Sequence, residues 1–112
     1  MQILQPPGWA KPRGYSNGVA AHGQIVFISG QIGWDDQCQF HTDDFVLQAR
    51  QALVNVVTVL AEAGGKPEHI ARLTWYVVNK ADYLARSKEL GQVYREIMGK
   101  HYPAMSAVAV AA

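Results

Sequence analysis

Residues 43–65 read DDFVLQARQALVNVVTVLAEAGG, and this stretch decides the fold. Its apolar side chains recur at spacings of three and four residues, so they lie on one face of a helix. Two aspartates favour the positive N-terminal end of that helix, Thr42 is the candidate N-cap, and the glycine pair ends it. The stretch predicts an amphipathic helix over 43–63, about 30 Å long, whose apolar face needs a covering layer.

Strand-forming sequences lie on both sides of this helix. Residues 24–32, QIVFISGQI, combine β-branched and aromatic side chains and predict a buried strand. Residues 15–21 predict a shorter strand, and the His22-Gly23 turn between the two runs predicts a hairpin. After the helix, residues 70–78 alternate between two faces, as a strand does. We therefore expect a sheet next to the first helix.

The C-terminal third predicts a second helix and a last strand. Asn79 is the candidate cap of a helix over 81–98, which Gly99 ends, and a strand follows over 104–110. Residues 1–14 are rich in proline and glycine and predict an extended N-terminal segment. The predicted order is β-β-α-β-α-β, a sheet with two helices packed on one face, which is an α+β architecture.

The composition predicts a single domain with part of its surface covered. The chain has 112 residues, of which 49% are hydrophobic and 17% are charged. Typical domains carry about 25% charged residues, and a small chain needs surface charge to stay monomeric. The shortfall predicts that another copy of the chain covers some of the surface. The net charge of +1 gives no bulk positive charge to bind nucleic acid or an anionic membrane.

Several kinds of site and location find no support in the sequence. Cys38 is the single cysteine, so no intrachain disulfide forms, and we interpret it as a loop residue. The four histidines are far apart, and none forms a pair with metal-ligand spacing, so we expect no metal site. Residues 1–8 lack the features of a secretory signal, and no apolar run approaches the about 18 residues of a membrane span. The expected location is the cytoplasm.

Candidate site residues lie where the strand over 24–32 ends. Gly30 lets backbone groups approach a ligand closely, and Ser29 adds a hydroxyl, although a glycine at a strand end can also be only a bend. Aromatic side chains are numerous for so short a chain. They either pack in the core and at interfaces or line a pocket closed by a neighbouring subunit. They include Trp9, Tyr15, Trp34, Trp75, Tyr76 and Tyr83.

Five blocks of sequence, in the same order, resemble the YjgF/RidA superfamily. The similarity covers residues 15–111, nearly the whole chain, and residues 102–106 resemble the family's Pro-Ala-Arg-Ser segment. The blocks are YSNGV at 15–19, VFISGQI at 26–32, QARQALVN at 48–55, AEAGG at 61–65 and YPAMS at 102–106.

The resemblance implies a chorismate-mutase-like fold that assembles as a homotrimer, with the sheets in a central barrel and the helices outside. Ligand pockets of this family lie in the clefts between subunits. Its best-known members hydrolyse reactive 2-imino or enamine acids to 2-keto acids and ammonia, without a metal or a cofactor. Other members have been described as ribonucleases, translation inhibitors or chaperones.

The family's site is carried over position by position. Met105 stands where the resemblance implies the deaminase arginine, and a thioether cannot hold a carboxylate with two parallel N–H···O bonds. Ala107 continues the same strand face, where the family places cysteine or another small residue. The family's last strand, with a glutamate that helps to position the attacking water, would follow Ala112. The implied substrate-binding residues are Tyr15, Ser29, Gly30, Gln31, Met105 and Ala107.

Three functions remain open at this point. The first is hydrolysis of small imines or enamines in a cleft between subunits, with Tyr15 and Ser29 orienting the substrate. The second is a ligand-binding or regulatory trimer without catalysis, which the apolar Met105, Ala107 and Ala109 favour. The third is RNA cleavage, which the net charge of +1 disfavours. The first matches the activity most often described for the family, whereas the residue at position 105 favours the second.

Overall fold

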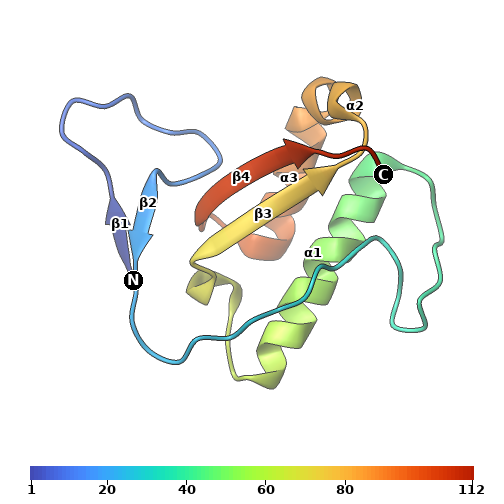
Figure 1. The fold of residues 1–112 in the computed structure, drawn as a ribbon, viewed down its shortest axis with the longest axis horizontal. Coiled ribbons are helices and arrows are strands. Elements are labelled where there is room, and N and C mark those ends of the chain that lie inside the picture. The colour runs from blue at the N-terminus through green and yellow to red at the C-terminus, as the bar shows by residue number, and fades with distance from the viewer.

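The computed structural model describes residues 1–112 and has an α+β architecture, as predicted (Figure 1). The elements from the first long helix onward follow the predicted order, with the second predicted helix divided in two. Before that helix the order differs, because β1 lies in the N-terminal segment and residues 24–32 form no strand. None of the helices combines the length and the apolar character needed to cross a bilayer. The elements are β1 Gln2–Leu4, β2 Gly18–Ala20, α1 Phe45–Glu62, the 3₁₀ turn η1 Pro67–His69, β3 Arg72–Val77, α2 Lys80–Ala85, α3 Ser87–Met98 and β4 Ala104–Ala109.

The centre of the fold is the parallel pair β3–β4, with α1 and α3 packed on one face (Figure 1). A parallel pair needs a crossover connection, and α2 and α3 supply it. Leu73 pairs with Met105 and Trp75 with Ala107, so these side chains share the face that the helices cover. The buried core beneath the helices is formed by Leu53, Leu60, Ile70, Tyr94 and Met98.

Helix α1 forms where the apolar periodicity predicts it, with its cap two residues later. Asp44 is the N-cap, and its carboxylate accepts a hydrogen bond of 2.9 Å from the Leu47 N–H. The predicted cap, Thr42, instead accepts a hydrogen bond of 3.0 Å from the Asp44 N–H and so supports the cap. At the other end Gly64 has a φ of 78°, a left-handed conformation that glycine adopts freely, and its N–H donates to the Ala61 carbonyl.

The predicted hairpin of residues 15–21 and 24–32 does not form. Strand β2 pairs antiparallel with β1 instead, and residues 24–32 run past α1 with no backbone hydrogen bond to a strand (Figure 1). The expected buried strand is therefore exposed, with Ile25 75% and Phe27 90% accessible. Strand-forming residues make a strand only beside the edge of another strand, and the free edge of β3 lies across a groove from this segment.

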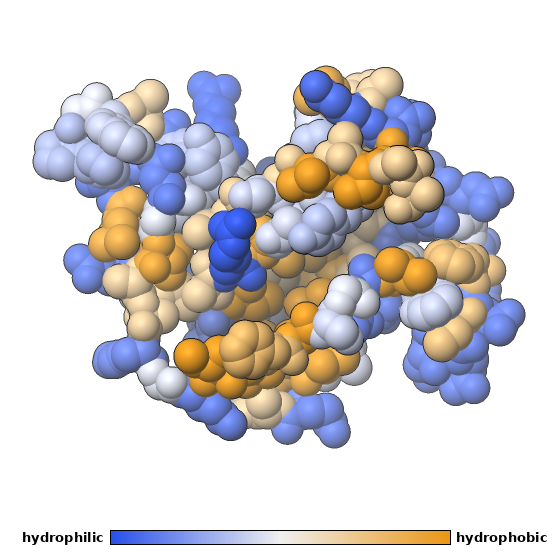
Figure 2. Space-filling model, viewed as in Figure 1, coloured by the Kyte–Doolittle hydropathy of each residue, from blue (hydrophilic) through white to orange (hydrophobic).

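This groove, of about 1590 Å³, lies between residues 24–33, α1 and β3. Figure 2 shows apolar side chains on both sides of the central hollow. Exposed apolar side chains that line the groove include Ile25, Tyr76 and Val78. Outside the groove, Phe27 and Val108 of β4 are also exposed. Apolar surface of this extent is typical of an interaction surface.

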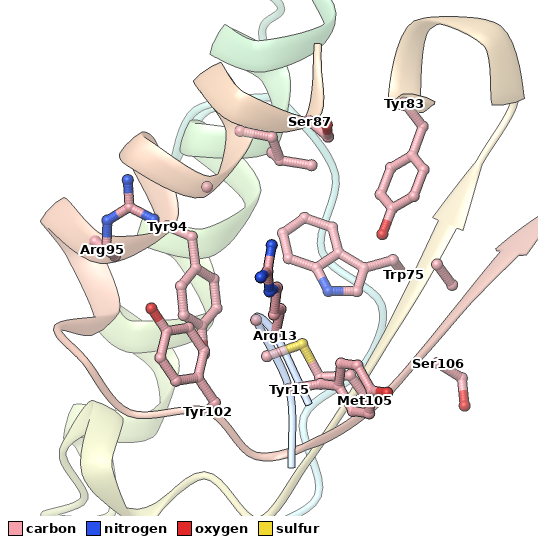
Figure 3. Close-up of a pocket in the computed structure, with 14 residues that line it drawn as sticks. Arg13, Tyr15, Trp75, Tyr83, Ser87, Tyr94, Arg95, Tyr102, Met105 and Ser106 are labelled. Carbon is pink, nitrogen blue, oxygen red and sulfur yellow. The ribbon is translucent and has the colours of Figure 1, made fainter. Parts of the chain in front are cut away.

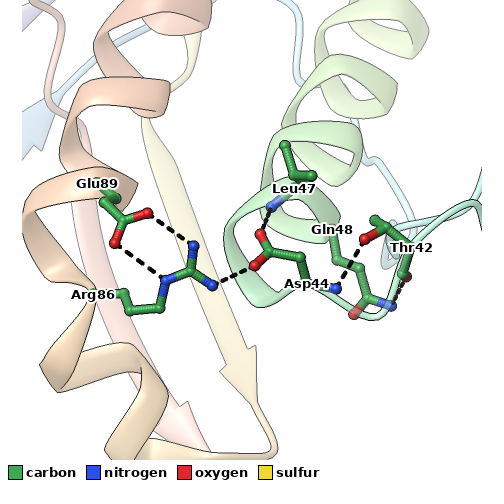
Figure 4. Close-up of polar contacts among 6 residues, drawn as sticks. All are labelled: Thr42, Asp44, Leu47, Gln48, Arg86 and Glu89. Atoms are coloured by element: carbon green, nitrogen blue, oxygen red, sulfur yellow. Dashed lines mark hydrogen bonds and ion pairs between the residues drawn. The ribbon is translucent and has the colours of Figure 1, made fainter.

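The predicted helix over 81–98 is divided into α2 and α3 at Arg86. Asn79 caps α2 as predicted, since its side chain accepts a hydrogen bond of 3.1 Å from the Asp82 N–H. Arg86, with φ −112° and ψ 22°, leaves helical geometry between the two helices. Its guanidinium bonds to Glu89 at 2.8 Å and to Asp44 at 2.5 Å, which joins the helix junction to the start of α1 (Figure 4).

The two Arg86 ion pairs make the stability of the fold depend on pH. The hydrogen bond from Arg86 holds the pKa of Asp44 below its ordinary value of 3.8, and the Leu47 N–H lowers it further. The hydrogen bond from Arg86 also lowers the pKa of Glu89 from its ordinary value of 4.5. Carboxylates with lowered pKa values stabilise the folded state above the unfolded-state pKa, and this stabilisation is lost as the pH falls through the folded-state pKa.

We expect Arg86→Gln to lower the urea midpoint at neutral pH, and the difference from the wild type to shrink below about pH 4, where both carboxylates become protonated. Lys88→Gln removes the same charge from an exposed residue of α3 that forms no ion pair, so its midpoint should match the wild type. Urea titrations followed by circular dichroism across this pH range measure both variants. A deficit of Arg86→Gln that is equal at every pH would contradict the assignment.

Candidate ligand-binding site

A pocket of about 400 Å³ lies between α3 and the β3–β4 pair, and the loop before β2 closes one side (Figure 3). Its walls are mostly aromatic. Three segments that are distant in the sequence contribute to it: residues 13–15, the helices α2 and α3, and the strands with the turn before β4. The aromatic residues are Tyr15, Trp75, Tyr83, Tyr94 and Tyr102.

The loop wall is held in place by Ser16. This residue is only 7% exposed, and its N–H donates a hydrogen bond of 3.0 Å to the Pro103 carbonyl. Its hydroxyl donates to the Tyr102 carbonyl, and Ser16 forms an isolated parallel bridge with Ala104. Gly14 has a φ of 76°, which favours glycine, and both of its neighbours line the pocket. The loop is therefore attached directly to the start of β4.

The sheet wall comes from alternate residues of β3 and β4. Trp75, Met105 and Ala107 lie on the face that the helices cover. Trp75 and Met105 also pack against the hydrophobic core, so their positions are fixed from below. These three residues offer an indole, a thioether and a methyl group, and the Ser106 hydroxyl is the polar group that β4 adds to the lining.

The helix wall comes from residues of α2 and α3 at spacings of three and four, which lie on one face. Tyr83, Ser87, Leu90 and Tyr94 all line the pocket. The rings of Tyr94 and Tyr102 stack at 5.5 Å between centroids, and the Tyr94 hydroxyl donates to the His101 carbonyl at 2.6 Å. Burial raises the pKa of Tyr94, and the neighbouring Tyr102 raises it further, so this phenol stays neutral.

The charge of the pocket is entirely positive. Arg13 and Arg95 line it, and no Asp, Glu or His does. Neither arginine forms an ion pair in the structure. No cluster of three His, Cys, Asp or Glu side chains that could hold a metal ion is present. The pocket can therefore hold an anion, and its hydroxyl groups can donate hydrogen bonds to a ligand.

The structure divides the residues that the resemblance implies between two places. Tyr15, Met105 and Ala107 meet in the pocket. Ser29, Gly30 and Gln31 line the large groove instead. The Gln31 amide donates to the Ser29 carbonyl at 3.2 Å, and a Cβ added to Gly30 would meet no atom within 4 Å.

Several pocket residues were not predicted from the sequence. Arg13, Tyr94, Arg95 and Tyr102 lie in the pocket without having been named as site residues. No local pattern marks Arg13, because the left-handed Gly14 (φ 76°) interrupts strand-like alternation between it and Tyr15. None marks Tyr102 either, whose position follows from the turn before β4. Among the other aromatic residues, Trp75 and Tyr83 line the pocket, whereas Trp9, Trp34 and Tyr76 do not.

Fold and pocket together define an α+β domain with an aromatic pocket of small-molecule size that carries two arginines. Residues 9–112 match the protein family described as Endoribonuclease L-PSP, and the chain belongs to this family. The names of its relatives also confirm the resemblance to the YjgF/RidA superfamily.

Three similar proteins illustrate this membership. A RutC family protein of Aquifex aeolicus is 34% identical over 97 residues, which cover 86% of this chain and 74% of the relative. A 2-iminobutanoate/2-iminopropanoate deaminase of Dermatophagoides farinae is 30% identical over 98% of this chain and 84% of the relative. The crystal structure of YyfB from Yersinia pestis, a protein of the conserved Rid family, has a TM-score of 0.83 and 28% identity, covering 97% of this chain and 86% of that one.

We expect Ser16→Ala to lower the free energy of unfolding by about 1–2 kcal/mol, because the part-buried Tyr102 carbonyl loses its hydroxyl donor. The matched control is Ser29→Ala, at an exposed serine whose hydroxyl forms no hydrogen bond, and its effect should stay within about 0.5 kcal/mol. Urea unfolding of both variants measures the difference. Equal stabilities would show that the Ser16 hydroxyl does not hold the loop.

Proposed function

We propose that this chain hydrolyses small reactive imines or enamines to a carbonyl compound and ammonia. The observation that carries the proposal is the meeting of Tyr15, Met105 and Ala107 in one pocket of small-molecule size. These positions come from different parts of the chain, and the resemblance implies each of them for the substrate site. The similarity to a protein named an iminobutanoate/iminopropanoate deaminase supports the same activity.

The pocket has groups that suit this reaction. Water adds to the carbon of the C=N bond, the nitrogen takes up a proton, and the resulting carbinolamine loses ammonia as the C=O bond forms. The Tyr15 hydroxyl forms no hydrogen bond within the protein, so it can orient the imine nitrogen or the attacking water. Water is the only co-reactant, and the proposal requires no cofactor.

We expect Tyr15→Phe to lower kcat by about 100-fold, because the substrate loses its positioned hydroxyl donor. Tyr76→Phe, at a tyrosine that is 69% exposed and outside the pocket, should keep the wild-type rate. The assay measures ammonia release from 2-iminopropanoate and 2-iminobutanoate generated in situ, together with uncharged imines. No rate above background for the wild type on any of them would contradict the proposal.

A second candidate function is ligand binding without catalysis. Met105 and Ala107 make the β4 wall of the pocket apolar, and no carboxylate or histidine in the pocket can act as a general base. RNA cleavage has weaker support, since the net charge is +1 and the pocket lacks the acidic and histidine groups of proton transfer. Binding of 2-keto acids by a chain that releases no ammonia would favour the binding function.

We also propose that the chain self-associates as a homotrimer through the apolar groove and the exposed sheet face. Ile25 is 75% exposed and Tyr76 69%, and both line the groove, one from residues 24–33 and the other from β3. A chain with only 17% charged residues needs such surfaces to be covered. The neighbouring subunit would also close the ligand-binding cleft.

We expect Ile25→Glu, at an exposed residue that lines the groove, to shift the chain to monomers, because the interface would have to bury a carboxylate. Leu84→Glu is the control, since Leu84 is 61% exposed on α2 and lies outside both the groove and the pocket. Light scattering coupled to size exclusion gives the mass of each variant. A wild-type chain that is a stable monomer at micromolar concentration would contradict the trimer.

A further inference from the structure

Arg13 is a cation in the pocket that no group of the protein neutralises. The ion pairs of the structure involve His41, Arg86 and their acidic partners, and none involves Arg13. Its guanidinium also donates no hydrogen bond to another residue, in contrast to Arg72, which donates to the Ser106 hydroxyl at 3.1 Å. A guanidinium has five N–H donors in a planar arrangement that matches a carboxylate. Those of Arg13 are all free for a ligand.

The fold aims Arg13 into the pocket. Figure 3 shows its side chain pointing into the space above Met105, between Trp75 and the stacked pair of Tyr94 and Tyr102. The attachment of Ser16 to the start of β4 holds the loop in this position. This positive charge therefore comes from the N-terminal loop, beside a strand wall that carries no charged group.

The other walls of the pocket restrict which chemical group can be attached to the carboxylate of a ligand. The walls around Arg13 present the flat faces of an indole and of phenol rings, and such faces stack on aromatic or other planar groups. Arg95, on the same helix as Tyr94, also lines the pocket and adds a second positive charge. With no acidic residue in the lining, the pocket disfavours a cationic ligand.

We propose that Arg13 is the carboxylate-binding residue of this pocket, and that the preferred ligand is a carboxylate with a planar aromatic body, such as an aromatic 2-imino or 2-keto acid. The proposal rests on the pocket of the proposed function and adds its substrate class. It does not depend on turnover, because a keto acid binds without reacting.

Calorimetric titration of the whole chain with phenylpyruvate tests the proposal, with pyruvate and phenylacetamide as comparison ligands. We expect phenylpyruvate to bind at least about 10-fold more tightly than either of the others, since pyruvate lacks the ring and the amide lacks the charge. Arg13→Gln should weaken phenylpyruvate about 10- to 100-fold and leave phenylacetamide unchanged, and Arg13→Lys should restore part of the affinity. Lys11→Gln removes the same charge from the same loop outside the pocket and should have no effect.

The outcomes separate this proposal from the proposed function. Equal affinity of the wild type and Arg13→Gln for phenylpyruvate would overturn the role of Arg13, and so would an equal loss for phenylpyruvate and phenylacetamide. Equal affinity of the wild type for pyruvate and phenylpyruvate would overturn the aromatic preference. Arg13-dependent binding in a chain that releases no ammonia would support this proposal and contradict the deaminase. Ammonia release by Arg13→Gln with the kcat/KM of the wild type would support the deaminase and contradict the role of Arg13.

Discussion

The attachment of Ser16 to the Tyr102–Pro103 segment is the constraint on which the pocket depends. Ser16 and Tyr102 are 86 positions apart, so this contact brings the N-terminal loop to the start of β4. Ser16 is the only buried residue between positions 11 and 17, and no other group of that loop is anchored in the core. Because the hydrogen bonds join backbone to backbone and hydroxyl to backbone, the loop follows any movement of β4. The pocket therefore forms only when both ends of the chain are folded.

The parallel pairing of β3 and β4 decides which face of the sheet carries the site. A parallel pair forces its connection to cross one face, and α3 lies on the same face as α1. Tyr94 packs into the core at the lower end of α3, whereas Ser87 and Tyr83 stand away from it toward the opening. The pocket is the region where helix and sheet diverge beyond close packing. Trp75 and Met105 line the pocket and also pack against the core, so core packing holds the sheet wall of the site in place.

The elements that the sequence predicted correctly are those that depend on contacts between near neighbours in the chain. Helix α1 and the β3 strand follow from apolar periodicity, and Asn79 was predicted as a cap because capping is a contact between near neighbours. Residues 24–32 were predicted wrongly as a buried strand because their environment depends on a distant strand edge. The division at Arg86 depends on a contact with Asp44, 42 positions away. Tyr15 was one of six aromatic candidates, and only the resemblance assigned it to the substrate site. The orientation of Arg13 follows from the long-range Ser16 contact, which no periodicity reveals.

Because the positive charge of Arg13 comes from a loop, that loop must be held in place for the pocket to bind a carboxylate. An arginine on β4 would be held by the sheet, whereas an arginine on a loop loses more conformational freedom when it binds a ligand. The loop must therefore be ordered before binding, and the buried Ser16 provides that order three positions after Arg13. Gly14 between them supplies the left-handed backbone that turns the loop without strain. A methionine at position 105 then leaves an apolar floor against which a planar ligand can pack while its carboxylate meets Arg13.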